Sequence, residues 1–404
     1  MTESPASITS KHTVAAVIGL LVLSIALRPA IVSIGPILLL IQQRFQLNYT
    51  QAALLTSIPD VCMGIFALMA PKLILRFGTD RCVVAALGLL GAASLMRAVS
   101  PNPAFLLGST FLISVGIAIA GALIGGWIKA HFSRHAAFFM GIYAAGLSVG
   151  ATIAAVFTAP IAEFTQSWRV GTGIWSVLCV SAVISWIWMA GRFKSAPGAP
   201  NKSPRLPVLL PWANPQAWLV AVNFGASQFV VYALFAWLAP ASSETAVTGL
   251  PSGILLGLFT SVFAVASVGA GMFPGKAHDR RPMLGFSTLL VMLAMAGMAF
   301  APALAPILYV LLAAIGLGMG FTLGMTLPLD NAANSEQAGA WTVFTLFVGY
   351  LVAALGPLCF GGLRDYTGSY TSAYEMLFAV ALLMLCITPL LKPAQEDGLQ
   401  TAVF

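Results

Sequence analysis

Twelve long apolar runs, separated by short polar stretches, make up nearly the whole chain. Most of them approach or exceed the roughly 20 apolar residues that an α-helix needs to cross the hydrocarbon core of a bilayer. The runs cover residues 14–41, 50–74, 82–99, 104–128, 136–162, 171–191, 214–240, 251–273, 284–301, 304–329, 340–362 and 371–391. The pattern therefore predicts an all-α, polytopic membrane protein with twelve transmembrane helices. The lipid bilayer is thus one of its expected partners.

Composition supports this class. Apolar residues form 59% of the chain and charged residues only 8%, and the mean hydropathy is +0.94, which excludes an ordinary soluble domain. The formal net charge of +7 describes the loops, so we expect no nucleic-acid partner. The five cysteines form no metal-ligand spacing, so we expect no disulfide and no metal. The first run is too long for a signal peptide and is interpreted as a retained helix.

The chain divides into two halves of six runs each. Residues 192–211, rich in Pro, Ser and Lys, are typical of a linker between a bundle at 1–191 and a bundle at 212–404. A shift of about 200 residues relates the halves, since Gly-Ile-Ala-Ile-Ala at 116–120 parallels Gly-Leu-Gly-Met-Gly at 316–320. A six-helix unit repeated in one orientation indicates two pseudo-symmetric bundles and a transporter with its site between them.

Basic residues predict the orientation. With the amino terminus in the cytoplasm, most of the 19 Lys and Arg residues fall in cytoplasmic loops and helix ends. The exceptions are Arg44, Arg97, Arg169 and Arg364 on the outer side and Arg28 within the membrane. The positive-inside rule therefore places both termini in the cytoplasm.

Arg28 is the main candidate for a functional residue. It lies near the middle of the first run, and Pro29, Gly35 and Pro36 break the helical pattern beside it. An arginine at mid-bilayer costs about 3 kcal/mol or more, so it must face protein or water and have a partner. We interpret Arg28 as the cation of a central substrate site. The alternative is a structural arginine bound to backbone carbonyls or to a carboxylate.

Asp60 follows Pro59 near the middle of the second run. Three roles stay open at this point: a partner of Arg28, a carrier of a coupling proton, or a hydrogen-bonded structural acid. An ion pair with Arg28 would keep Asp60 charged and make it a poor proton site unless the pair opened.

The seventh run supplies polar candidates from the second half. The shift of about 200 residues carries Arg28 onto Gln228, and Asn223, Ser227 and Tyr232 are expected on the same side of that helix. We predict that Gln228, Asn223 and Tyr232 bind substrate. The alternative is a set of ordinary hydrogen bonds between helices.

Two loops carry a motif that resembles the major facilitator superfamily, and the resemblance extends over essentially the whole chain. Arg-Phe-Gly-Thr-Asp-Arg at 76–81 and Lys-Ala-His-Asp-Arg at 276–280 are degraded copies of the loop motif of that superfamily. The resemblance implies a cytoplasmic gating loop that latches the halves, formed by Gly78, Asp80, Arg81, Asp279 and Arg280. The alternative is a basic loop with a helix cap.

A narrower resemblance points to the cyanate and nitroimidazole transporter group of that superfamily. It rests on Leu-Arg-Pro-Ala-Ile-Val-Ser-Ile-Gly-Pro at 27–36, Ala-Leu-Leu-Thr-Ser-Ile-Pro at 53–59, Leu-Met-Arg at 95–97 and Met-Gly-Ile-Tyr at 140–143. The resemblance implies a monomer in the bacterial inner membrane that carries a small anion or polar heterocycle. Asp60 departs from the apolar residue expected after Pro59.

These observations predict a secondary transporter of a small anion, such as cyanate or a small organic anion, that works by alternating access. The alternative is proton-coupled export of a small neutral or cationic compound such as a nitroimidazole or a drug. The glycine-rich antiporter motif is missing at Ala-Pro-Ile-Ala, residues 159–162, which disfavours that alternative. We expect no enzyme activity and no cofactor, because the sequence has no catalytic cluster and no phosphate-binding loop.

Overall fold

The computed structural model describes residues 10–132, 135–193, 210–272, 279–332 and 335–391. These residues are helical with short connections and contain twelve segments long and apolar enough to span a membrane, which confirms the predicted all-α class. The first six spans comprise α1 Ser10–Leu27, α2 Pro29–Val32, α3 Ile34–Phe45, α4 Tyr49–Phe77, α5 Thr79–Ala98, α6 Pro103–His131, α7 Ala136–Phe164, α8 Trp168–Gly173 and α9 Ser176–Ala190. The last six comprise α10 Pro215–Thr245, α11 Ser252–Met272, α12 Arg281–Phe300, α13 Pro306–Asp330, α14 Ser335–Ala353, α15 Leu355–Thr367 and α16 Thr371–Ile387, followed by a 3₁₀ turn.

Asparagines fix the starts of three long helices. The side chains of Asn48, Asn102 and Asn214 accept hydrogen bonds from backbone amides in the first turns of α4, α6 and α10, at 2.7, 2.8 and 2.9 Å. Such caps satisfy amides that have no partner within the helix. Proline follows Asn102 and Asn214 directly, where its missing N–H costs nothing.

The first span is a broken helix. The helix is interrupted at Arg28, between α1 and α2, and again at Ser33, between α2 and α3, although both residues keep right-handed helical backbone angles. Pro29 and Pro36 have no N–H, so the helical hydrogen-bond ladder loses donors at both places. All four residues of α2 are buried among their neighbours, and Arg28 directly precedes them.

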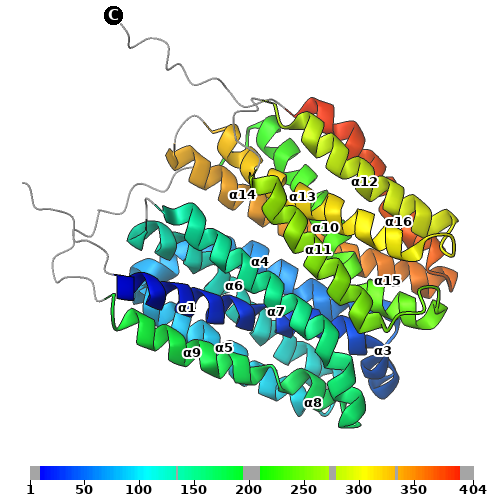
Figure 1. Ribbon diagram of the computed structural model, residues 1–404, viewed down its shortest axis with the longest axis horizontal. Helices are drawn as coiled ribbons and strands as arrows, with labels where there is room; N and C mark the ends of the chain where they lie inside the picture. The colour runs from blue at the N-terminus through cyan, green and yellow to red at the C-terminus, as the bar shows by residue number, and fades with distance from the viewer. Residues whose placement is uncertain (1–9, 133–134, 194–209, 273–278, 333–334, 392–404) are drawn as a thin grey trace, which may run out of the picture.

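The spans form two groups that lie side by side in Figure 1, α1–α9 below and α10–α16 above. We call the end where α9 ends and α10 begins the linker end, and the opposite end the distal end. The distal end lies to the right in Figure 1, near the labels α3, α8 and α15.

The two halves are joined by polar contacts at the distal end. Asp365 of α15 accepts hydrogen bonds from the backbone amides of Tyr49 and Thr50 in α4, at 2.9 and 2.8 Å. Glu244 of α10 accepts from the Tyr49 hydroxyl at 2.8 Å and pairs with Arg364 at 2.9 Å. We call these five residues the distal latch.

Helices α7 and α11 show that the halves separate toward the linker end. Near the distal end, Gly257 packs so closely that an added Cβ would lie 2.4 Å from the Val156 side chain. Val268, three turns further along the same stripe of α11, is 48% exposed, and Val149, two turns before Val156, is 45% exposed. This conformation is thus closed at the distal end and more loosely packed at the linker end.

The predicted gating loop lies at the linker end. Gly78 joins α4 to α5 at a φ of +79°, a conformation that side-chain-bearing residues rarely adopt, and Asp80 lies in the first turn of α5. Asp80 and Arg81 are exposed. Within the described residues, neither side chain forms a hydrogen bond or ion pair with the second half, so the latching role of this loop stays a prediction.

The second copy of the loop is anchored within its own half. Arg280 donates hydrogen bonds to both carboxylate oxygens of Asp330, at the end of α13. Asp279 pairs with Arg281 at 2.8 Å, and this hydrogen bond lowers the pKa of the Asp279 carboxyl from its usual value. The preceding residues 276–278 lie outside the described part of the chain.

Candidate functional site

Arg28 reaches from the first half of the protein to the second. Its guanidinium Nη1 donates a hydrogen bond to the hydroxyl of Tyr232 in α10, at 3.4 Å. The Arg28 side chain is only partly buried, whereas Tyr232 is 1% exposed. A cation at a helix break is therefore positioned between the halves, where solvent still reaches it.

Two further tyrosines surround this cation. Tyr143 of α7 and Tyr350 of α14 both interact electrostatically with Arg28. The rings of Tyr232 and Tyr350 meet edge to face, with centroids 6.3 Å apart. Tyrosines from both halves thus lie near one guanidinium, and Tyr232 is the one that hydrogen-bonds to it.

Asp60 of α4 lies near the same place. Its exposed fraction is 0%, and neither carboxylate oxygen has a hydrogen-bond partner. The charge of Arg28 acts on it, but no ion pair within 4.0 Å joins these two described residues. A buried carboxylate without partners is costly, so Asp60 is under pressure to bind a proton or gain a partner.

The candidates of α10 face two directions. Asn223 and Ser227 line a narrow polar recess inside the second half with Ser287 and Thr288. Tyr232 lies nine residues after Asn223, which is half a turn away in projection on a helix of 3.6 residues per turn. The expectation that Asn223 and Tyr232 share one side is therefore wrong. The steps of four, one and four residues that join Asn223, Ser227, Gln228 and Tyr232 add up to two and a half turns.

Gln228 keeps its place as a candidate. It precedes Tyr232 by one turn, and its side chain is 3% exposed with no partner for Oε1. An unsatisfied buried carbonyl oxygen is a group that a ligand, a water molecule or a conformational change can satisfy. Asn223 also has an unpartnered Nδ2, but it lies in the recess of the second half.

Arg97 is a second buried arginine in the first half. It is 1% exposed and donates hydrogen bonds to the carbonyl oxygen of Ala30 at 2.7 Å and to the Thr110 hydroxyl at 3.2 Å. No carboxylate lies within ion-pair distance of it among the described residues. Its positive charge is therefore held by neutral dipoles alone.

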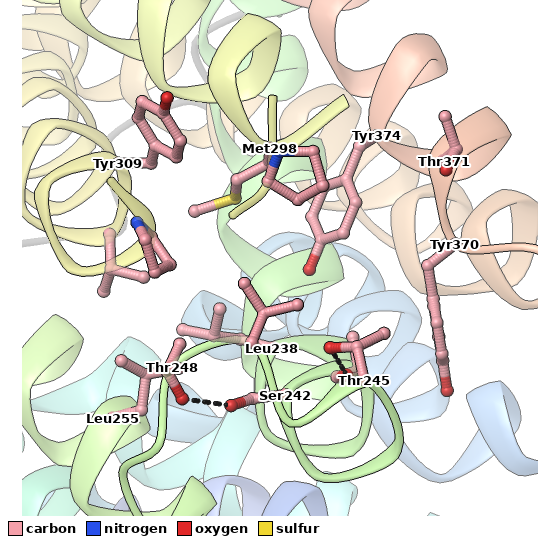
Figure 2. Close-up of a pocket in the computed structure, with 15 residues that line it drawn as sticks. Leu238, Ser242, Thr245, Thr248, Leu255, Met298, Tyr309, Tyr370, Thr371 and Tyr374 are labelled. Carbon is pink, nitrogen blue, oxygen red and sulfur yellow. Dashed lines mark hydrogen bonds between the residues drawn. The ribbon is translucent and has the colours of Figure 1, made fainter. Parts of the chain in front are cut away.

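A cavity of about 110 Å³ lies elsewhere, within the distal part of the second half (Figure 2). Figure 2 shows the hydroxyl of Tyr374 directed toward Leu238 and Thr245, and Ser242 bonded to Thr248 at 2.8 Å. The lining residues carry no charge and include none of the predicted site residues. The cavity is thus separate from the Arg28 site.

The described spans form a polytopic membrane protein with two groups of helices, and comparison with known proteins identifies it as a member of a transporter family. Residues 15–357 match the Major Facilitator Superfamily, and the chain belongs to that family. Proteins of this family are transporters and not enzymes, as the sequence predicts.

Two curated relatives from Escherichia coli strain K12 match over nearly their full length. The chain is 30% identical over 372 residues to the cyanate transport protein CynX, covering 91% of this chain and 95% of the relative. It is 27% identical over 378 residues to the 2-nitroimidazole transporter, covering 94% and 95%. Both names belong to the transporter group that the motifs of the sequence resemble.

Solved structures support the fold alone. The nucleoside transporter NupG matches with a TM-score of 0.74 at 10% identity, covering 94% of this chain and 98% of that structure.

Proposed function

We propose that this protein is a secondary transporter of a small monovalent anion, with Arg28 in its central site. A guanidinium stays charged at any relevant pH and presents a planar fork of donors that suits an oxyanion. Tyr232 and Gln228 would complete the site from the second half with neutral hydrogen bonds. The name of the cyanate transport protein agrees with a small anion of this kind.

The observation that carries this proposal is the charge balance of the interior. Arg28 and Arg97 are cations of the first half, and Asp60 is the buried acid near Arg28. The two arginines leave a net positive charge whether Asp60 is ionised or neutral. A single negative charge on the substrate would reduce this imbalance, whereas a cationic substrate would increase it.

The arrangement of the halves supports an alternating-access cycle. The distal latch closes one side, and the exposed stripe of α7 and α11 leaves the other side loosely packed. If the linker end is cytoplasmic, as the basic residues predict, this conformation communicates with the cytoplasm. The bacterial relatives and the distribution of charge favour the inner membrane, with both termini inside.

A second candidate function rests on Asp60. A buried carboxyl with no hydrogen-bond partner is the group expected of a proton carrier, and the name of the 2-nitroimidazole transporter suggests a neutral heterocycle as cargo. The alternative is thus proton-coupled export of a small neutral compound, with Asp60 as the coupling residue.

Binding and transport assays with two probes separate these functions. Cyanate and 2-nitroimidazole are each added to purified protein, and the melting temperature is followed, because a bound solute stabilises the native state. The same probes are then tested for exchange in proteoliposomes with and without a proton gradient. We expect cyanate to stabilise and exchange through the wild type and not through Arg28→Ala. Binding of 2-nitroimidazole alone, insensitive to Arg28, would favour the alternative.

A further inference from the structure

Arg97 binds the broken part of the first span. Its Nη1 donates to the carbonyl oxygen of Ala30 at 2.7 Å, from the last turn of α5. Its Nη2 donates to Thr110 of α6 at 3.2 Å. Three different spans therefore meet at one guanidinium, and one of them is the segment that begins at Arg28.

Ala30 belongs to a short segment in which the helix is interrupted on both sides. The four residues of α2 lie between the interruptions at Arg28 and Ser33. Because Pro29 has no N–H, the carbonyl oxygen of Ile25 loses its usual helical donor. A short helix with few internal bonds takes its orientation from the elements around it.

Helix α7 packs closely against the end of α1. Gly150 of α7 lies so near the backbone at Ile25 that an added Cβ would be 2.3 Å from its carbonyl oxygen. This contact supports the end of α1, before Arg28. On the other side of Arg28, the hydrogen bond from Arg97 is a directed, charge-assisted tie to α2.

We infer that Arg97 is a positioning residue, which holds α2 so that the Arg28 guanidinium stays between the halves. This inference rests on the proposed function of Arg28. It also accounts for the burial of an arginine that has no carboxylate partner among the described residues, because its guanidinium hydrogen-bonds to Ala30 and Thr110 instead. Lysine at position 97 keeps the charge but cannot bind Ala30 and Thr110 together.

The first test is a double-variant cycle on cyanate affinity. Arg97→Lys should weaken cyanate binding about fivefold, equal to ~1 kcal/mol, when Arg28 is present. In the Arg28→Lys background the same change should have no further effect, because a residue that acts through Arg28 is not additive with it. Equal losses in both backgrounds would overturn the inference.

The second test does not depend on the substrate. Amide hydrogen exchange of the peptide covering residues 29–41 should accelerate in Arg97→Lys and, through loss of the hydroxyl partner, in the milder Thr110→Val. The matched control is Arg169→Lys, because Arg169 also donates to a backbone carbonyl, that of Ser100 at 2.9 Å, but does not contact α2. Unchanged exchange of this peptide in both variants would refute the positioning role.

The two readouts also separate this inference from the proposed function. If the wild type binds no cyanate, the proposed substrate loses its support, and the exchange experiment alone decides the role of Arg97. If cyanate binds and the exchange is unaltered, Arg28 keeps its role and Arg97 loses its own.

Discussion

Asp365 accepts a hydrogen bond from the backbone amide of Thr50 at 2.8 Å, so a carboxylate from one half of the protein caps a helix in the other half. It accepts another from the Thr50 hydroxyl at 2.6 Å. The first turn of a helix carries unpaired amides and a partial positive charge, which favour an anion at that place. These bonds join the two halves at the distal end, and any parting of the halves there would have to break them.

The first prediction concerns this cap. Asp365→Asn removes the negative charge and one acceptor oxygen, so the equilibrium should shift toward opening at the distal end. Ser57 lies two turns below Thr50 on the same face of α4 and is 2% exposed. We expect Ser57→Cys to react several times faster with an impermeant maleimide from the distal side when Asp365→Asn is also present.

Glu163→Gln provides the control for this measurement. Glu163 is an exposed acid at the distal end of α7, and its side chain bonds to no described residue of the second half. It should leave the reaction rate of the cysteine unchanged. Equal rates with and without Asp365→Asn would mean that the cap does not hold the distal end closed.

The sequence predicted the fold and the break in the first span because their causes are local. Long apolar runs define spans by themselves, and Pro29 and Pro36 remove backbone donors wherever they occur. The placement of Asn223 beside Tyr232 was wrong because a helix rotates 100° per residue, and small offsets accumulate over nine residues. The rotation between two residues must be summed over the whole distance that separates them, because a series of pairs that each share a side can still end half a turn apart.

The site itself depended on contacts that sequence order does not encode. Tyr143 stands in the motif at 140–143, yet nothing in the sequence links it to Tyr350 of the other half. The sequence predicts a position near the outer end of its run for Arg97 but no role, because the partner of Arg97 is the backbone carbonyl of Ala30. A carbonyl has no residue signature, so only the hydrogen bond seen in the structure reveals it.

The second prediction concerns Asp60. If Asp60 carries the coupling proton, Asp60→Asn should abolish uphill transport and leave substrate exchange intact, since the amide is neutral and cannot cycle a proton. If Asp60 instead becomes the partner of Arg28 in another conformation, the change should damage binding or folding. Exchange and gradient-driven uptake of cyanate in proteoliposomes distinguish the two, and full uphill uptake by Asp60→Asn would eliminate the coupling role.

The third prediction concerns the gating loop at the linker end. Asp80→Asn removes a charge from the first turn of α5, and we expect it to favour opening at the linker end if the loop latches the halves there. Turnover should then change more than affinity, because the substituted residue lies far from Arg28. Initial rates and binding constants for cyanate, measured side by side, check this. A variant with the wild-type transport rate would mean that the motif serves only as a basic loop.

The fourth prediction concerns orientation. His135 lies at the linker end, before α7, and Ser243 lies at the distal end of α10, and both are exposed. In intact cells, an impermeant maleimide should label Ser243→Cys and should label His135→Cys only after permeabilisation. Labelling of both from outside would defeat the predicted cytoplasmic location of the linker end.

The fifth prediction concerns Arg28. Arg28→Lys keeps the positive charge but loses the planar donor fork, so it should weaken cyanate binding at least tenfold, about 1.4 kcal/mol. Arg28→Ala should abolish binding while the protein still inserts and purifies. The competing account makes Arg28 a structural partner of Asp60. In that account Arg28→Ala leaves the Asp60 carboxylate buried without its counter-ion, at a cost of about 3–5 kcal/mol.

The most direct test of the account measures cyanate affinity, transport and melting temperature for Arg28→Ala, Asp60→Ala and the double variant. Substrate binding by Arg28 predicts that both proteins lacking the guanidinium fail to bind and transport cyanate, whatever residue stands at position 60. Recovery of transport and stability in the double variant would contradict it, because the arginine would then serve only to balance the acid.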